Sequence, residues 1–527
     1  MAEPAARERH VVVVGAGVGG LVAALLLACR GLRVTLVEAQ QAPGGKLRQL
    51  VVDGAAIDAG PTVFTMRWVF DEIFDAAGTT LDAELALQPL PVLARHAWRG
   101  HEARLDLHAD VDESADAIAA FAGPDEGRRY LAFCAEAREV YRRLEGPHIR
   151  SARPSLPQMI GDLGPGGLKR LAGLGPLATL WKSLGRHFHD PRLRQLFARY
   201  ATYCGASPWA APATLMLVAH VEQQGVWSVG GGMHALARSL SALAARRGVV
   251  QRYGTRCERL LLQGGRVRGV QLAGGERLAA DAVVFNGDVA ALAAGLLGDE
   301  ARPAAPATPQ RSLSAVTWAL HARTEGFPLE RHNVFFDDDY KSEFDDIFRR
   351  RRLPRQGTVY LCAQDRGGDA GAARGPRGRE RLLALVNAPA EGDRRSFADE
   401  ETEACERRAL ALLADCGLRL APKPRQVQRC TPADFERLFP GSGGALYGPA
   451  THGWMALFKR AASASRLPGL YLAGGSVHPG PGVPMAAMSG RLAAETLLAH
   501  LGSTSRSRRV VIAGGTSTPS PTTAASG

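Results

Sequence analysis

The chain has 527 residues, 46% of them hydrophobic and 22% charged, so it can bury a large core and should divide into two or more structural units. Its formal net charge of +12 indicates an acidic partner, either nucleic acid or anionic lipid. The alternative is that the high arginine content reflects only the amino-acid usage of the genome. The eight cysteines are scattered without a CxxC pair, which favours free thiols in a reduced compartment over a disulfide framework or a metal site.

The first predicted elements form a dinucleotide-binding unit. A strand over residues 11–14 runs into a turn with Gly15, Gly17 and Gly20, a helix follows over 21–29, and a strand over 33–37 ends beside Glu38. Gly15 permits the tight turn, Gly17 has no Cβ to block a pyrophosphate, and Gly20 lets the helix approach the sheet. The helix N-terminus offers N–H groups to phosphate, and Glu38 has the spacing of a ribose-binding acid. The alternative is a glycine-rich loop without a ligand.

The stretch 11–29 carries no charge and has the length of a membrane-spanning helix, roughly 17–25 residues. Its four glycines and β-branched opening favour instead a strand and helix buried on both faces of a parallel sheet. No positively charged n-region with a small-residue cleavage site precedes it, so we do not expect a signal peptide. We therefore expect a cytoplasmic protein without transmembrane spans.

Two glycine-rich segments follow, Gly45-Lys46 and, after a hairpin turn at 53–54, Gly60-Pro61-Thr62. Here the chain resembles the flavoprotein superfamily of amine oxidases, protoporphyrinogen oxidases and carotenoid desaturases. The resemblance implies FAD rather than NAD, with Gly45 and Lys46 at the pyrophosphate and Gly60, Pro61 and Thr62 beside the flavin. Backbone amides and an ammonium group suit a phosphate.

A second cofactor segment is predicted from residue 230 onward. Glycines at 230–232 open an amphipathic helix through 240, and a strand from 257 to 262 leads into a hairpin over 266–278 and a buried strand over 281–286. The resemblance implies that the backbone of Cys257 meets the adenine.

A third segment lies near the end of the chain. A short strand over 469–473 is followed by a turn with Gly475, His478, Val483, Pro484 and Met485, and then by a helix over about 487–498. Such a turn can place backbone donors against the flavin carbonyl oxygens. The flanking prolines and glycines favour a structural role for His478, so no catalytic residue is identified.

The third segment and the stretch 60–70 narrow the resemblance. Both resemble the hydroxyneurosporene, or 1-hydroxycarotenoid 3,4-, desaturases of purple phototrophic bacteria, within the carotenoid and phytoene desaturase family. The implied reaction moves a hydride from C4 to flavin N5 and a proton from C3, with an apolar tunnel positioning an acyclic hydroxylated carotenoid. A single dinucleotide pocket favours quinone or oxygen as electron acceptor.

Three alternatives stay open. A phytoene or neurosporene desaturase would use the same fold, and an amine or porphyrinogen oxidase would use the same cofactor. A lipid-escort protein would have lost FAD. Nucleic-acid binding is disfavoured because the basic residues are dispersed without a reading module.

The predicted fold class is α/β, a Rossmann-like FAD-binding domain of the amine-oxidase and phytoene-desaturase type with an inserted sheet-plus-helices substrate domain. We expect the FAD-binding domain to comprise residues 9–87, 228–287 and 456–500, and the substrate domain 88–227 and 288–455. Residues 502–527, rich in Ser, Thr, Pro and Gly, should be disordered.

One stretch of the substrate domain, 157–191, mixes leucines with basic residues and Trp181. This pattern predicts a helical contact with anionic lipid, and hence peripheral attachment to the inner or photosynthetic membrane. The alternative is an amphipathic helix packed in the core.

Overall fold

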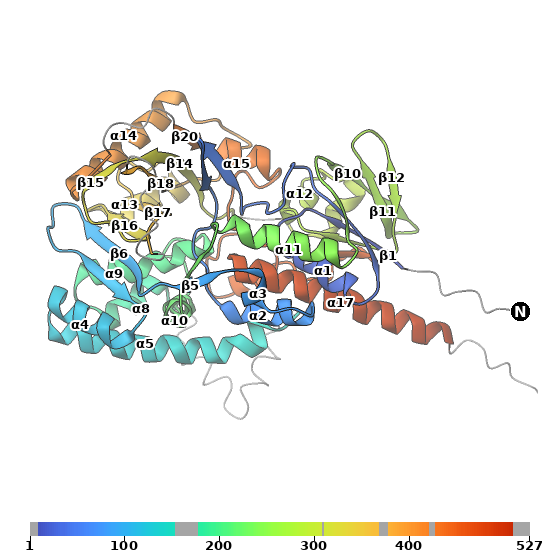
Figure 1. Cartoon of the computed structure of the whole chain (residues 1–527), viewed down its shortest axis with the longest axis horizontal. Helices are drawn as coiled ribbons and strands as arrows, with labels where there is room; N and C mark the ends of the chain where they lie inside the picture. Colours follow the sequence, from blue (N-terminus) through green and yellow to red (C-terminus); the bar gives the residue numbers. More distant parts are fainter. Residues whose placement is uncertain (1–8, 153–177, 308–309, 368–377, 421–426, 510–527) are drawn as a thin grey trace, which may run out of the picture.

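Two sheets organise the chain in the computed structural model, which describes residues 9–152, 178–307, 310–367, 378–420 and 427–509 (Figure 1). In this view the larger sheet lies to the left and the smaller one to the right, with helices around both. The predicted α/β architecture is thus observed.

The smaller sheet has five parallel strands. Alternate side chains of its central strand enter different cores: Val11 and Val13 pack with the helices, and Val12 and Val14 pack with the β-hairpin layer on the other face. Because both faces are covered, the strand needs no polar residue, which explains the uninterrupted apolar run. In sheet order the strands are β21 (Leu470–Leu472), β13 (Ala282–Phe285), β1 (His10–Val14), β2 (Arg33–Val37) and β9 (Val250–Arg252).

Three helices cover one face of this sheet, as Figure 1 shows to the right of centre. They are α1 (Val18–Ala28), α11 (His234–Arg246) and α17 (Val483–Arg509). A short helix, α2 (Arg67–Ala76), packs beside α17. The other face carries the three-stranded sheet β10 (Cys257–Gln263), β11 (Arg266–Leu272) and β12 (Arg277–Ala279), with α12 (Val289–Ala293).

Helix α17 is longer than the sequence suggested. It begins at Val483 and continues to Arg509, so the prediction of disorder is wrong for residues 502–509. The sequence has no proline from residue 485 to 509, so no residue there lacks the N–H that a continuing helix needs. The remainder of the predicted tail, 510–527, lies outside the described residues.

The larger sheet has seven strands, antiparallel except where β16 pairs with β6. Helix α14 (Asp399–Asp415) packs on one face, and α5 (Pro124–Leu144), α8 (Leu180–His187) and α9 (Pro191–Ala198) pack near the end of the sheet formed by β16, β6 and β7. The strands in sheet order are β20 (Val427–Cys430), β14 (Ser314–Ala322), β18 (Glu380–Ala388), β17 (Val359–Ala363), β16 (His332–Phe336), β6 (Val92–Trp98) and β7 (Leu105–His108).

Several smaller elements complete the fold. The strands β5 (Leu87–Pro89) and β8 (Trp227–Val229) pair where the chain leaves the smaller-sheet region and where it returns. The others are the hairpin β3 (Gln49–Val52) and β4 (Ala55–Asp58), the pair β15 (Thr324–Gly326) and β19 (Leu418–Leu420), and the helices α3 (Leu81–Glu84), α4 (Val111–Ala122), α10 (Leu217–Gln223), α13 (Tyr340–Phe344), α15 (Pro432–Leu438) and α16 (Ala456–Lys459).

The stretch predicted to contact the membrane is only partly described. Residues 157–177 lie outside the described part. In α8, Leu180 and Leu184 are fully buried, and the Trp181 ring lies 4.6 Å from the Trp209 ring, centroid to centroid. This packing favours the core alternative for α8.

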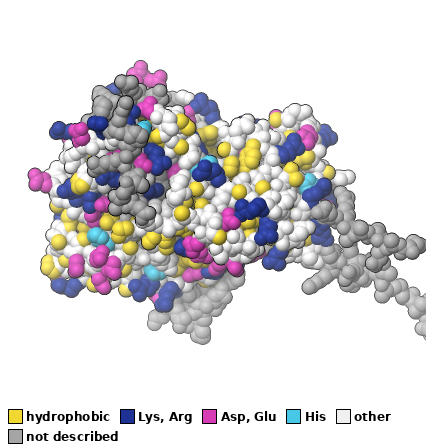
Figure 2. Space-filling view, viewed as in Figure 1, with side chains coloured by type: hydrophobic (Ala, Val, Ile, Leu, Met, Phe, Trp, Pro, Cys, Tyr) yellow, Lys and Arg dark blue, Asp and Glu magenta, His cyan; other side chains and the backbone are white. Residues whose placement is uncertain are grey.

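Among the described residues, no helix is both long and apolar enough to span a membrane. On the face drawn in Figure 2, basic and acidic side chains are interspersed rather than gathered into one patch. All eight cysteines lie in the described part and are free thiols.

Candidate active site

A cavity of about 850 Å³ connects the two sheet regions. Thirteen of the fourteen residues that the sequence predicted to bind cofactor line it: Gly15, Gly17, Glu38, Gly45, Lys46, Gly60, Pro61, Thr62, Cys257, Gly475, Val483, Pro484 and Met485. Gly20 lies behind this wall. The cavity therefore brings together segments that are more than 400 residues apart in the chain.

Neighbouring atoms leave no space for side chains at the glycines of the first turn. A Cβ on Gly20 would lie 2.0 Å from the carbonyl oxygen of Gly15, and a Cβ on Gly17 would lie 2.8 Å from Asn286 Nδ2. Gly45 lies against Gly17, since its own Cβ would be 3.2 Å from the Gly17 Cα. The turn and the segment 43–46 thus form a backbone-lined cradle of the shape a pyrophosphate requires.

Asn286 is a residue whose role the sequence analysis missed. It follows β13, and its Nδ2 donates to the Gly15 carbonyl at 3.3 Å. A polar residue at the carboxyl end of a buried parallel strand was the signal, because such ends meet at the ligand crevice.

Glu38 lies at the adjoining part of the cavity and is 8% exposed. Its carboxylate accepts from the N–H groups of Ala16 at 2.6 Å and Gln40 at 2.8 Å, which fixes its orientation. Each carboxylate oxygen can accept more than one hydrogen bond, so acceptor capacity remains for a ribose hydroxyl.

The strand with Cys257 begins close to Glu38, because the Thr255 N–H donates to the Glu38 carbonyl at 2.7 Å. Burial raises the pKa of the Cys257 thiol to about 12. The thiol is therefore protonated and unreactive, which agrees with a role for the backbone alone.

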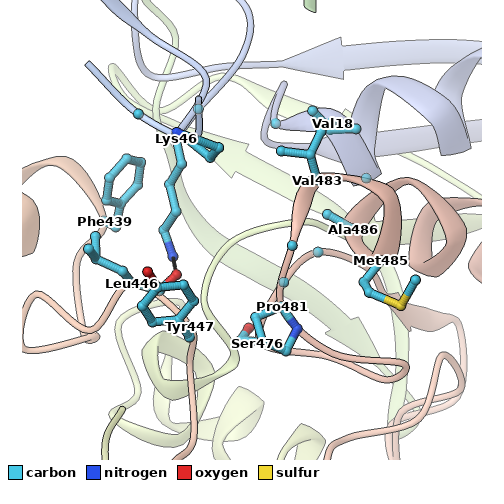
Figure 3. Close-up of a pocket in the computed structure, with 18 of the residues that line it drawn as sticks. Val18, Lys46, Phe439, Leu446, Tyr447, Ser476, Pro481, Val483, Met485 and Ala486 are labelled. Carbon is cyan, nitrogen blue, oxygen red and sulfur yellow. Dashed lines mark hydrogen bonds between the residues drawn. The ribbon is translucent and has the colours of Figure 1, made fainter. Parts of the chain in front are cut away.

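Lys46 makes a different contact from the one that the resemblance implied. Its Nζ donates to the Leu446 carbonyl at 2.7 Å and lies 5.3 Å from the centre of the Phe439 ring, pointing toward Leu446 and Tyr447 (Figure 3). Burial lowers the pKa of Lys46, while Asp288 opposes the shift. A buried ammonium group needs such an acceptor, and the structure supplies one away from the glycine cradle.

The carboxy-terminal segment contributes the first turn of α17. In Figure 3, Val483, Met485 and Ala486 lie on this turn, and Val483 faces Val18 of α1. The N-termini of α1 and α17 therefore both meet the cavity, where their free N–H groups favour an anionic or electron-rich ligand.

His478 is almost fully buried beside this turn. Its Nε2 donates to the carbonyl oxygens of His148 and Ser151, both at 2.9 Å. Burial lowers the pKa of His478 to about 4, so the ring is neutral near pH 7. It thereby fastens the turn to the segment 148–151.

A chain of hydroxyl and imidazole groups begins at Thr62. The Tyr360 hydroxyl lies 2.6 Å from Thr62 Oγ1 and 2.7 Å from His332 Nδ1. Burial lowers the pKa of His332 to about 3, and in the described part of the chain His332 Nε2 is buried without a hydrogen-bond partner. The chain leads from the cavity wall into the larger sheet and offers lone pairs to a proton.

A second polar group of the wall comes from helical segments. Tyr203 and Tyr200 donate to the two carboxylate oxygens of Glu222 at 2.6 Å and 2.7 Å, and Arg199 lies over the Tyr203 ring. This cluster was not predicted from the sequence. Its only signal was an acid, Glu222, directly after the short and mostly apolar run 217–221, which is weak by itself.

The remaining wall beside these groups is mostly apolar. Aliphatic and aromatic side chains from α10, β18 and α15 line it, among them Leu217, Val218, Val221, Leu383, Leu385 and Phe435. The cavity therefore combines a polar, backbone-lined end with an apolar end, as needed by a dinucleotide and a hydrocarbon.

Residues 18–498 match the family described as "Flavin containing amine oxidoreductase". The chain belongs to this family. The membership confirms the predicted FAD cofactor, and the glycine cradle, Glu38 and the two helix N-termini fit that group.

The chain is 67% identical over 525 residues to a hydroxyneurosporene desaturase of Rubrivivax gelatinosus, covering 99% of both chains. It is 46% identical over 501 residues to a hydroxyneurosporene desaturase of Cereibacter sphaeroides, covering 94% of this chain and 99% of that one. A zeta-carotene-forming phytoene desaturase of Myxococcus xanthus is 33% identical, covering 96% and 97%. The predicted membership of the carotenoid desaturase branch is confirmed.

Among solved structures, an oxidoreductase from Methanosarcina mazei superposes with a TM-score of 0.58 at 15% identity, covering 92% of this chain and 100% of the other. The likeness concerns the fold, and it confirms the predicted architecture.

Proposed function

We propose that this protein is an FAD-dependent desaturase that introduces a C3–C4 double bond into acyclic 1-hydroxycarotenoids. The observation that carries the proposal is the cavity in which the predicted cofactor residues at one end meet an apolar wall at the other. The 67% identity to a hydroxyneurosporene desaturase over nearly the whole chain supports this substrate over phytoene.

The chemistry removes a hydride from C4 and a proton from C3. FAD, when bound, supplies the oxidant that takes up the hydride. The apolar side chains of the cavity exclude water and hold the polyene end in one orientation, so positioning supplies much of the rate. A cation delocalised along a polyene needs no strong base to lose the neighbouring proton.

We assign the proton to the Thr62–Tyr360–His332 chain. Thr62 belongs to the segment that the family resemblance places beside the flavin, and its hydroxyl lies 2.6 Å from the Tyr360 hydroxyl. The Tyr360 hydroxyl in turn lies 2.7 Å from His332 Nδ1, so a proton can move inward along the chain. Burial lowers the pKa of His332 to about 3, so its neutral ring is a weak base, which is sufficient only because a C–H beside a polyene cation is strongly acidic.

The division into domains is part of the proposal. The five-stranded sheet draws only on residues 9–87, 228–287 and 456–500, which would form the cofactor domain, and the seven-stranded sheet only on 88–227 and 288–455. We further propose peripheral attachment to a membrane, since the substrate dissolves in lipid and the net charge is +12. Quinone or oxygen would reoxidise the flavin.

The proposal is tested by mixing the purified, FAD-containing protein with 1-hydroxyneurosporene without oxygen and following the visible flavin absorbance. Bleaching of the flavin with formation of the 3,4-desaturated product is expected. Bleaching by phytoene but not by the hydroxylated carotenoid would assign the protein to the early desaturases. Purification without any flavin absorbance, with either carotenoid still binding to the protein, would indicate a lipid-escort protein.

A further inference from the structure

A half-buried cation lines a cavity whose neighbouring wall is largely apolar. Arg199 begins the short helix η2 (Arg199–Cys204), directly after α9, and its side chain faces the cavity rather than bulk solvent. Both terminal nitrogens lie 3.5 Å from the Tyr203 hydroxyl, which is the long limit of a hydrogen bond, and none of the described residues bonds the buried Nε. Within the described residues, its guanidinium has no ion-pair partner.

The nearest acid is held by other groups. Glu222 is 7% exposed, and its two oxygens accept from Tyr203 and Tyr200. Burial raises the pKa of both phenols, so they stay protonated and keep donating to the carboxylate. The Tyr203 hydroxyl therefore lies between Arg199 and Glu222 and leaves donor groups of the guanidinium unused.

An unused cation is costly in such a place. Transfer of a charged group from water to an apolar site is unfavourable unless hydrogen bonds replace its hydration. A purely hydrocarbon ligand would cover Arg199 without supplying any acceptor. A ligand with one hydroxyl group would supply an acceptor oxygen to Arg199 and a donor for the remaining lone pairs of Glu222 or Tyr203.

The position along the cavity also fits a hydroxyl close to the reacting carbons. Arg199, Tyr203 and Glu222 line the same cavity as Thr62 and Tyr360, whose hydroxyl oxygens lie 2.6 Å apart. In a 1-hydroxycarotenoid, the oxygen-bearing C1 is three bonds from C4, roughly 4 Å for single C–C bonds of about 1.5 Å. A hydroxyl site must therefore lie near the segment that holds Thr62.

We propose that Arg199, Tyr203 and Glu222 form a subsite for the tertiary hydroxyl group at C1 of the substrate. Arg199 donates to the hydroxyl oxygen, and the hydroxyl donates to Glu222 or to the Tyr203 oxygen. This subsite sets the register of the polyene, so that C3 and C4 rather than more distant carbons lie beside the flavin. The inference rests on the proposed function and deepens it.

The test compares binding of two polyenes that differ only in the hydroxyl group, 1-hydroxyneurosporene and 1,2-dihydroneurosporene. Kd for each is measured on the FAD-containing protein in detergent micelles, for the wild type and Arg199→Met. We expect the wild-type preference for the hydroxylated polyene to fall roughly tenfold to hundredfold in the variant, as for loss of a hydrogen bond to a charged group. An unchanged ratio of the two Kd values would overturn the proposal.

Two further variants keep the test decisive. Tyr203→Phe removes one oxygen only, so it tests the subsite if Arg199→Met does not fold, and it should lower the same ratio. Arg194→Met is the matched control: Arg194 lies on α9 over the Trp181 ring, outside the cavity wall, and its loss should leave the ratio unchanged. Flavin absorbance checks that each variant retains FAD.

Different results would refute the proposed function and the hydroxyl subsite. Absence of wild-type turnover with 1-hydroxyneurosporene would refute the proposed function. Wild-type turnover with equal hydroxyl preference in wild type, Arg199→Met and Tyr203→Phe would refute the subsite alone.

Discussion

The carboxylate of Asp58 accepts a hydrogen bond from the backbone N–H of Met233 at 2.6 Å, across 175 positions of sequence. A weaker bond from the His234 N–H, at 3.4 Å, makes Asp58 the acceptor for the N-terminus of α11. Gly232 is required there, because its φ is +87° and a Cβ would lie 2.3 Å from Asp58 Oδ2. One carboxylate thus ties the Gly60-Pro61-Thr62 segment to the second cofactor segment.

Replacing Asp58 by alanine should therefore reduce both stability and cofactor content. Two buried N–H groups would lose their acceptor, at a cost of about 1–3 kcal/mol in the free energy of unfolding. Urea unfolding and the ratio of flavin to protein absorbance measure the two effects. Asp116→Ala, at an exposed position of α4, is the control and should change neither. Wild-type stability and FAD content in Asp58→Ala would contradict this role.

Two glycines of α17 should respond oppositely to the same substitution. A Cβ on Gly490 would lie 2.1 Å from the Gly19 carbonyl oxygen of α1, whereas one on Gly502 would meet nothing within 4 Å. Gly490→Ala should separate the helices and lower the melting temperature with loss of FAD. Gly502→Ala should be neutral or stabilising by up to about 1 kcal/mol, because alanine is the better helix former. Equal melting temperatures for the two variants would show that the close approach is unimportant.

Tyr360→Phe breaks the proposed proton chain without changing the apolar wall. We expect kcat to fall roughly a hundredfold, within the range for loss of a general base, with little change in KM. Steady-state kinetics with 1-hydroxyneurosporene provide the test. Tyr253→Phe, which removes a hydroxyl bonded to Ser241 and Gln251 outside the cavity, should retain wild-type kcat. If Tyr360→Phe also retains it, the proton leaves by another route.

Three buried histidines should make the fold sensitive to acid. Burial lowers the pKa of His96, His148 and His332 to about 3, whereas unfolded histidine titrates near 6.5. The unfolded chain therefore binds protons that the folded chain does not, and stability is lost as the pH falls below about 6.5. Each such proton contributes up to about 1.4 kcal/mol per pH unit.

Urea midpoints between about pH 7.5 and 5.5 measure this effect. His96→Phe keeps an aromatic ring beside Phe336 and should make the pH dependence shallower. His101→Gln, at an exposed position, should leave the slope as it is in the wild type. A slope that is the same in His96→Phe would contradict the assignment.

The cofactor residues that could be predicted from the sequence are those that lie close together within one short segment. One strand–helix–strand unit contains Gly15, Gly17, Gly20 and Glu38. Their spacing along the chain is therefore enough to predict their relative positions. The far segments around Gly60, Cys257 and Gly475 needed the family resemblance, because nothing local says that they meet in space.

The other residues of the site could not be predicted, because their contacts join positions that are far apart in the sequence. Arg199 and Glu222 stand in separate helical segments, and neither spacing nor periodicity distinguishes a cavity-facing charge from a solvated one. The ammonium contact of Lys46 with Leu446 spans 400 positions and likewise could not be foreseen. The length of α17 was missed because polar composition was taken as disorder, although no proline interrupts that stretch.

The most direct test of the central claim is pigment analysis after expression of the chain in cells that accumulate either phytoene or a 1-hydroxycarotenoid. The account predicts a product that has lost two hydrogen atoms and absorbs at longer wavelength, formed only from the hydroxylated carotenoid. Conversion of phytoene, with the hydroxylated carotenoid left unchanged, would contradict it.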